Sequence, residues 1–173
     1  MKKTLLGLVV SSLFAVGTAQ ATDVAATLSV VGQVNTASSS CFVSLDNSAI
    51  NLTADLVELK PQDQATVPAK IVAVSVFGNG NGCETLASQG KIAYKLKGTA
   101  DAAAGTAMAN TGTATGVGIG LYKEDGTVLK INQDSLVSNS LETKLGVGLV
   151  KLTGQQANSG TVHGSLTIEI ERL

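Results

Sequence analysis

Two cysteines and a single histidine are the residues of this 173-residue chain best suited to chemistry. Cys41, Cys83 and His163 together offer too few ligands for a structural metal ion, which usually has four. Two cysteines in an exported chain most often pair with each other. We therefore expect a disulfide between Cys41 and Cys83, and no metal or other cofactor. The bridge would close a long loop, so its chain-entropy contribution should be on the order of 4 kcal/mol.

A secreted hydrolase is one alternative, because a histidine can activate a nucleophile. His163, however, alternates with apolar residues and falls on the polar face of a predicted strand. The sequence contains no G-x-S-x-G elbow, and nothing singles out a carboxylate pair for glycoside hydrolysis. The glycine-rich runs at 78–82 and 116–120 match no phosphate-binding pattern, and we interpret them as turn and close-packed strand glycines. We predict that the protein is not an enzyme.

The first residues indicate export. Lys2 and Lys3 precede an apolar run over 5–16 that closes on Ala19-Gln20-Ala21, which is the pattern of a signal peptide cleaved after Ala21. The run is short for a membrane span, which needs about 20 apolar residues. Loss of residues 1–21 leaves a mature chain with more acidic than basic residues, whereas a nucleic-acid-binding surface would be basic. We expect an exported protein with no nucleic-acid partner.

The elements that position these residues are predicted to be β-strands. Apolar and polar residues alternate with period two between Gly, Asn, Asp and Pro, and no segment predicts a convincing amphipathic helix. The expected strands are 24–34, 40–45, a weaker one at 50–52, 70–77, 91–98, 117–122, 127–131, 145–153 and 161–171.

Two segments between these strands have their own character. The Gly-, Ala- and Thr-rich residues 98–116 predict a mobile loop or an irregular edge. Residues 56–70, with two prolines, predict a connection or a broken edge strand. Several short strands at roughly even spacing favour an all-β sandwich in one domain.

The two cleanest alternating segments lie at the two ends of the mature chain. In the first, six residues share one face: Val24, Ala26, Leu28, Val30, Gly32 and Val34. Residues 35–40 then form a small polar tether before Cys41. In the second, the shared face consists of Val162, Gly164, Leu166, Ile168 and Ile170, with Gly160 just before them.

In four respects the chain resembles the type 1 pilin family of chaperone-usher fibres. Its N-terminal segment has Gly32 on the apolar face and is followed by a cysteine. The second cysteine ends a hydrophobic stretch, VSVFGNGNGC at 74–83. The run ATGVGIGLYKEDG at 114–126 is similar to the family's stretch before its middle hairpin. Gly160 stands fourteenth from the end, where the family's chaperone-recognition pattern places a glycine.

This resemblance implies an immunoglobulin-like sandwich that lacks its last strand and is completed by donor-strand exchange. Residues 1–21 would be the signal peptide, 22–40 the donor-strand arm and its tether, and 41–173 the pilin domain. The apolar face of the arm would form the donor strand. The second apolar face, from Gly160 to Ile170, would form the acceptor groove and the chaperone contact.

The implied function is a structural subunit of a pilus, or fimbrium, that supports surface adhesion. The implied partners are a periplasmic pilus chaperone, an outer-membrane usher and neighbouring pilus subunits. The implied route runs through the periplasm to the cell surface.

Two features depart from the family's pattern. Arg172 stands next to last, where the family usually has an aromatic residue, and the stretch from Gly32 to Cys41 is slightly longer than usual. A further alternative also stays open: a monomeric secreted sandwich, such as a carbohydrate-binding module, whose N-terminal segment completes its own sheet.

Overall fold

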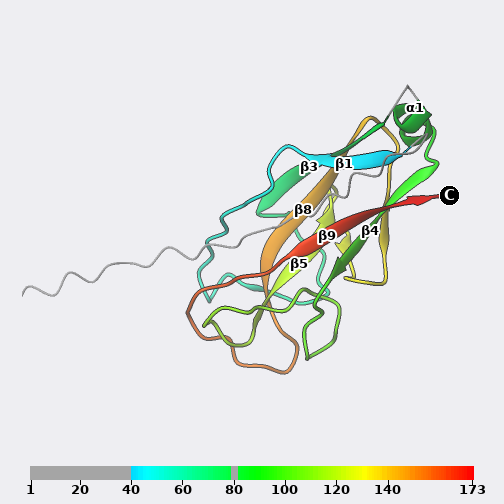
Figure 1. Ribbon diagram of the computed structural model, residues 1–173. Coiled ribbons are helices and arrows are strands. Elements are labelled where there is room, and N and C mark those ends of the chain that lie inside the picture. Colours follow the sequence, from blue (N-terminus) through cyan, green and yellow to red (C-terminus); the bar gives the residue numbers. More distant parts are fainter. Residues whose placement is uncertain (1–39, 79–81) are drawn as a thin grey trace, which may run out of the picture.

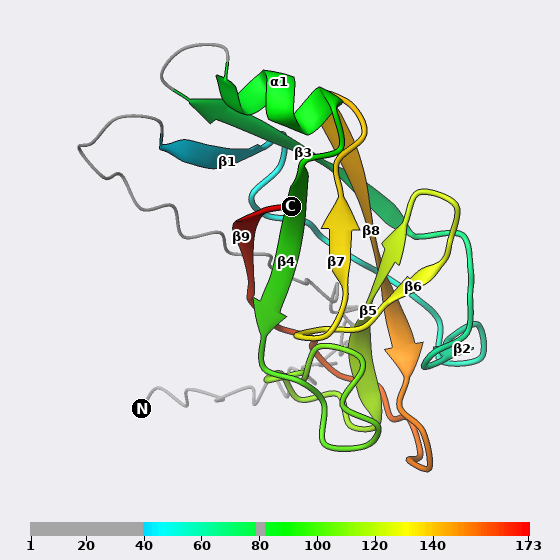
Figure 2. The same ribbon diagram turned by 90° about the vertical axis from the view of Figure 1, so that its right-hand side faces the viewer.

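The computed structural model describes residues 40–78 and 82–173, which form two stacked β-sheets and one short helix (Figure 1). The larger sheet has the order β1-β3-β8-β5-β6, with β2 beside β8. Its strands are β1 (Cys41–Leu45), β2 (Lys60–Pro61), β3 (Lys70–Gly78), β5 (Val117–Lys123), β6 (Val128–Leu129) and β8 (Glu142–Lys151). The smaller sheet has the order β7-β4-β9, formed by β7 (Ser135–Val137), β4 (Ile92–Gly98) and β9 (Leu166–Arg172). Figure 2 shows this sheet in front, with β4 between its two neighbours.

The core lies between the two sheets and follows the alternation in the sequence. On β4, Ile92, Tyr94 and Leu96 point into it and are almost fully buried. On β3, Val72, Val74 and Val76 do the same from the opposite layer. All strand pairs are antiparallel except the short β2–β8 contact. The predicted all-β, immunoglobulin-like sandwich is confirmed.

One helix, α1 (Gly82–Ser88), contradicts the expectation of no helix. It buries Cys83 and Ala87, which are four residues apart and therefore share one face. Its end is closed at Gly90, where φ is 69° and the Lys91 N–H donates to the Leu86 carbonyl at 2.8 Å, a common helix-terminating arrangement. A single face of two buried residues is too short to stand out in a sequence.

Other element boundaries also differ from the prediction. Residues 50–52 are not a strand, although Ile50 and Leu52 are buried in the core. The strand expected at 127–131 shrinks to β6, β7 was missed, and the strand expected at 161–171 begins only at Leu166. The predicted arm strand at 24–34 and the predicted signal peptide lie outside the described residues.

Residues 98–116 form the irregular edge that was one of the two expectations for this segment. Met108 is buried, and its backbone exchanges hydrogen bonds of 2.8 and 3.0 Å with Ile119 of β5. The strand glycines are close-packed, as expected: a Cβ on Gly120 would stand 2.6 Å from the Tyr122 hydroxyl. Among the described residues, no helix is long and apolar enough to cross a membrane.

Candidate functional site

β1 and β9 border the two sheets next to each other, and this border is called here the β1–β9 edge. β9 pairs with β4 from Ile92↔Arg172 to Gly98↔Leu166, and no other strand within residues 40–78 and 82–173 pairs with its second side. β1 is the outermost strand of the other sheet and lies next to β9. A strand edge of this kind is a template for pairing with another chain.

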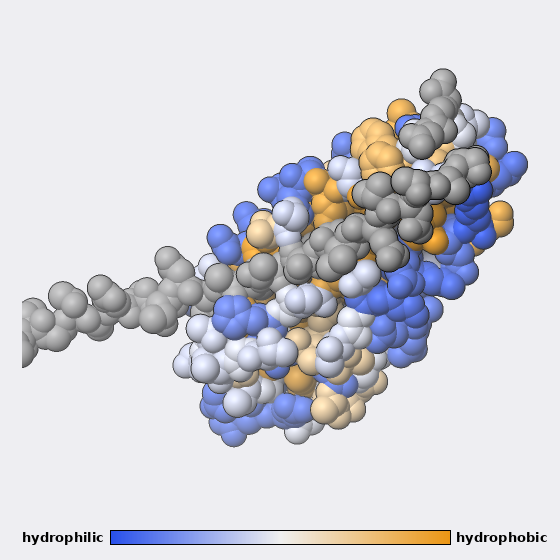
Figure 3. Space-filling model, in the orientation of Figure 1, coloured by the Kyte–Doolittle hydropathy of each residue, from blue (hydrophilic) through white to orange (hydrophobic). Residues whose placement is uncertain are grey.

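The predicted acceptor residues lie in one row along this edge. Val162, Leu166 and Ile168 are buried in the core, and Ile170 is partly buried against it. The intervening side chains of His163, Ser165 and Glu169 are exposed. The structure thus brings the predicted row together on one face of the C-terminal segment. Hydrophobic surface is visible on the side of the molecule that carries β1 and β9 (Figure 3).

The first part of the row is held by a loop instead of a strand. The segment before β9 packs against residues 110–114: Ala114 N–H donates to the Thr161 carbonyl at 3.0 Å, and His163 N–H donates to Asn110 Oδ1 at 2.9 Å. This explains why the regular strand starts later than predicted. These contacts occupy the backbone of His163 and leave its imidazole at the surface.

Gly160 has a structural reason to be glycine. A Cβ there would lie 2.4 Å from the backbone nitrogen of Ala114 and 2.7 Å from the carbonyl carbon of Thr113. Such distances are far below van der Waals contact, so a side chain would push the two segments apart. Gly160 therefore fixes the close approach that starts the apolar row. Its predicted contact with a chaperone is a separate matter and stays a prediction.

A small apolar pocket of about 60 Å³ lies beside Gly160. One wall consists of Ala114, Val117 and Val162; Leu56 and Leu59, in the connection between β1 and β2, form the other. Sequence reasoning missed this second wall, because residues so far apart in the chain share no local pattern. A larger cavity of about 840 Å³ lies elsewhere, between β7 and the β5–β6 hairpin, and is lined mainly by polar side chains.

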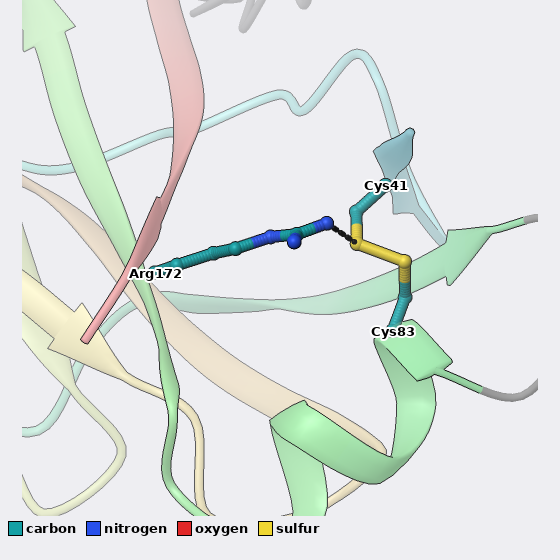
Figure 4. The surroundings of a disulfide bond; sticks show 3 residues. All are labelled: Cys41, Cys83 and Arg172. Atoms are coloured by element: carbon teal, nitrogen blue, oxygen red, sulfur yellow. Dashed lines mark hydrogen bonds between the residues drawn. A yellow bond between two sulfur atoms is a disulfide. The ribbon is translucent and has the colours of Figure 1, made fainter. Parts of the chain in front are cut away.

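The predicted disulfide joins Cys41 at the start of β1 to Cys83 in α1, with a Cα–Cα distance of 5.7 Å (Figure 4). Figure 4 also shows the side chain of Arg172 reaching from the end of β9 towards this bridge. Its Nη2 donates to Cys41 Sγ at 3.4 Å. Arg172, which departs from the family pattern, thus links β9 to β1 at the end of the edge nearest α1.

Charged residues lie on the solvent-facing side of the smaller sheet. Lys95 Nζ lies 2.7 Å from Glu171 Oε1, across the β4–β9 pair. The pair is partly exposed, so it stabilises the sheet by at most about 1 kcal/mol. Within the described residues, no group of three or more His, Cys, Asp or Glu side chains is placed to hold a metal ion.

A buried polar cluster that no sequence pattern predicted is called here the Asp101 clasp. Asp101 Oδ2 accepts from Gln62 Nε2 at 2.7 Å and from Ala107 N–H at 3.0 Å. Gln62 Oε1 in turn accepts from Thr153 N–H at 3.2 Å. Burial alone would raise the pKa of Asp101, but the backbone N–H donors around it, Ala107 first, outweigh that effect and hold the pKa below its ordinary value. The clasp ties the 98–116 loop to the ends of β2 and β8.

Comparison with known proteins places this geometry in a family. The sequence profile described as "Fimbrial protein" matches residues 29–171. No curated protein matches the chain in sequence. Twenty-two chains of solved structures match its fold. One is the crystal structure of the P pilus rod subunit PapA, with a TM-score of 0.52 and 13% sequence identity over 83% of this chain and 99% of that one.

Proposed function

The chain belongs to the fimbrial protein family, and from this premise we propose that it joins its pilus by donor-strand exchange at the β1–β9 edge. As a fimbrial protein it is a structural subunit of a pilus, which assembles with other subunits and is displayed at the cell surface. The family is one of structural proteins, not enzymes. Membership also disfavours the alternative of a monomeric secreted binding module.

The observation that carries the proposal is that β9, next to a row of core residues, has a strand partner on one side only within the described residues. Leu166 and Ile168 lie on the border strand of the smaller sheet and yet belong to the central core, as does Val162 in the segment just before that strand. A strand added to β9 would gain main-chain hydrogen bonds on one side, and its alternate side chains would meet this row. Both strand pairings in this sheet are antiparallel, so an antiparallel addition would continue its pattern.

The N-terminal arm has the composition that such a strand needs. Its apolar face carries Val24, Ala26, Leu28, Val30 and Val34, and Gly32 on the same face would fit where the groove is shallow. Burial of a Val or Leu side chain contributes roughly 1.5–3 kcal/mol. Several such residues with a full ladder of hydrogen bonds would make the joint dissociate very slowly, even after the costs of association. Added antiparallel to β9, the arm would place Val34 near Gly160 and Val24 near Arg172.

Polymer formation follows from this head-to-tail contact. The arm of one subunit and the β1–β9 edge of the next are different surfaces, so each subunit can bind two neighbours. A contact between unlike surfaces that does not close on itself produces a filament.

Before assembly, the apolar row and the strand edge would promote aggregation if left uncovered. We therefore also propose the finer roles implied by the family: a periplasmic chaperone covers the edge from Gly160 to Ile170, an outer-membrane usher directs the exchange, and residues 1–21 direct export. Surface adhesion by the finished pilus belongs to the same proposal.

The arm assignment can be tested by a charge on each of its faces. Leu28→Asp or Val30→Asp puts a carboxylate on the apolar face and should abolish incorporation into fibres, because a buried unpaired charge is strongly unfavourable. Ser29→Asp adds the same charge on the opposite face and should leave incorporation largely intact. The measurement is fibre yield by electron microscopy and the recovery of each variant with its chaperone. Normal fibres from Leu28→Asp and Val30→Asp would count against the assigned arm.

A further inference from the structure

In this domain the more polar aromatic residues are buried and the less polar ones are exposed. Both tyrosines are buried, Tyr94 at 0% and Tyr122 at 1% exposed. Both phenylalanines of the described chain, which are the more hydrophobic rings, stay at the surface, Phe42 at 49% and Phe77 at 43% exposed. Phenylalanine is normally among the residues most often buried. Neither phenylalanine belongs to the hydrophobic core, so packing within the domain does not explain this pair.

The two rings form one small surface on the outer face of the larger sheet. Phe42 of β1 and Phe77 of β3 are directly opposite each other in the strand register, and their ring centroids are 6.0 Å apart. The neighbouring residues of β1, Cys41 and Val43, turn towards the core on the other face. Because Cys41 is bonded to Cys83 of α1, the pair lies at the α1 end of the molecule (Figure 1).

The position of the pair along the chain points to what covers it. Phe42 follows directly after the predicted tether of residues 35–40. Six residues of fully extended chain reach at most about 20 Å. If the arm is seated in a neighbouring subunit up to Val34, that neighbour must lie within this reach of Cys41.

A matching surface stands at the other end of the same tether. The turn after β1 carries Leu56, 42% exposed, and Val57, 94% exposed. Leu56 also lines the small pocket beside Gly160, where an antiparallel donor strand would place its last apolar residue, Val34. The acceptor subunit therefore presents Leu56 and Val57 at the point where the tether leaves it.

We propose that the Phe42–Phe77 pair docks onto the Leu56–Val57 turn of the neighbouring pilus subunit that receives this chain's arm. This contact rests on the proposed function, because the arm brings the two surfaces together. Aromatic residues are enriched at protein interfaces and dominate their energetics. The contact is far smaller than a stable interface needs, so it forms only at the high local concentration that the tether provides. It turns a flexible link between subunits into a fixed joint.

Site-specific photo-crosslinking tests the location directly. The full-length subunit carrying p-benzoylphenylalanine in place of Phe77 is assembled into fibres and irradiated, and crosslinked peptides are identified by mass spectrometry. We expect crosslinks to residues 56 and 57 of an adjacent subunit. The same photoreactive residue in place of Val137, which is 50% exposed on β7 of the other sheet, should give none to that turn.

The outcomes separate this inference from the proposed function. Fibres that form through the arm but show Phe77 crosslinks only to other sites, to a different protein or to nothing would overturn the docking contact alone. Failure of the unmodified subunit to form any fibre would overturn the arm assignment, and the docking contact with it.

Fibre stiffness gives a second readout that does not depend on the crosslinker. Phe42→Ser with Phe77→Ser, or Val57→Ser alone, should leave the amount of fibre unchanged and shorten its persistence length about twofold, because the tether alone then links the subunits. Val67→Ser is the matched control, since Val67 is 89% exposed outside both surfaces. Unchanged stiffness in the Phe42/Phe77 and Val57 variants would contradict the proposal.

Discussion

The β1–β9 edge and the Asp101 clasp hold parts of the same sandwich by different means. In the clasp, a buried carboxylate accepts hydrogen bonds from Gln62 and from backbone N–H groups of its own loop. Along the edge, β9 has a strand partner on one side within the described chain, and its inward face is an apolar row. A polar cluster works only with fixed partners in fixed positions. A strand edge with an apolar row is suited to a strand from another chain whose alternate side chains match the row.

The chain relies on its own residues at the clasp and is suited to another molecule at the edge. The clasp closes a loop on the body of the domain with specific polar contacts. The edge offers hydrogen-bonding groups and hydrophobic surface without specifying which chain supplies the partner. Substitutions that weaken only the clasp or only the edge can therefore test whether the two regions have these separate roles.

Loss of the disulfide should have the largest effect. Cys41→Ser together with Cys83→Ser frees the start of β1, which is one wall of the β1–β9 edge. The chain-entropy estimate of the loss is on the order of 4 kcal/mol, which is a large fraction of the net stability of a domain of this size. The yield of folded subunit and its thermal midpoint should both fall. Values equal to the wild type would contradict a structural disulfide.

A methyl group at Gly160 should have the next largest effect. Gly160→Ala forces the chain apart from Ala114 and Thr113, and should cost close to 3 kcal/mol, the upper end of typical overpacking. Gly154→Ala is the matched control: nothing lies within 4 Å of its Cβ position, and only its φ of 71° opposes the substitution, which should cost about 1 kcal/mol. Denaturant unfolding measures both. Equal losses would show that the close approach at Gly160 is unimportant.

Removal of the clasp carboxylate should have a smaller, pH-dependent effect. Asp101→Asn at neutral pH should cost about 1–3 kcal/mol, because buried backbone donors lose a charged acceptor. The folded state lowers the pKa of Asp101, so the stabilisation is fully present above the unfolded pKa of about 3.9 and is lost as the pH falls through the folded value.

The check is the difference in unfolding free energy between wild type and Asp101→Asn, measured at pH 7 and again near pH 3. This difference in unfolding free energy should be smaller near pH 3 than at pH 7. Asp125→Asn should show a change in the same direction but a smaller one, because Asp125 also has a lowered pKa, from its hydrogen bonds with Thr127, but lies at the surface. A difference for Asp101→Asn that stays constant with pH would argue against an ionised clasp.

Period-two alternation carried most of the fold prediction. It located β3, β4, β5, β8 and most of β9, because in each of these strands apolar side chains recur at every second residue and pack in the core. It could not locate α1, whose single buried face holds only Cys83 and Ala87, or the three-residue β7. Ile50 and Leu52 follow the same alternation and are buried, but they form no strand.

The candidate site was predictable only where it is local. The row from Val162 to Ile170 follows from alternation within one segment. The other wall of the pocket, at Leu56 and Leu59, and the contact between Gln62 and Asp101 depend on residues brought together by the fold across long stretches of chain. The pairing of residues 161–163 with 110–114 has the same origin.

In donor-strand exchange, the strand that completes β9 comes from a different molecule. The most direct measurement assembles an equal mixture of ¹⁵N-labelled subunits and unlabelled subunits, the latter with p-benzoylphenylalanine in place of Leu28, and analyses the crosslinks by mass. We expect crosslinks from the unlabelled arm to residues 162–170 of labelled chains. Crosslinks confined to the arm's own, unlabelled chain would contradict it.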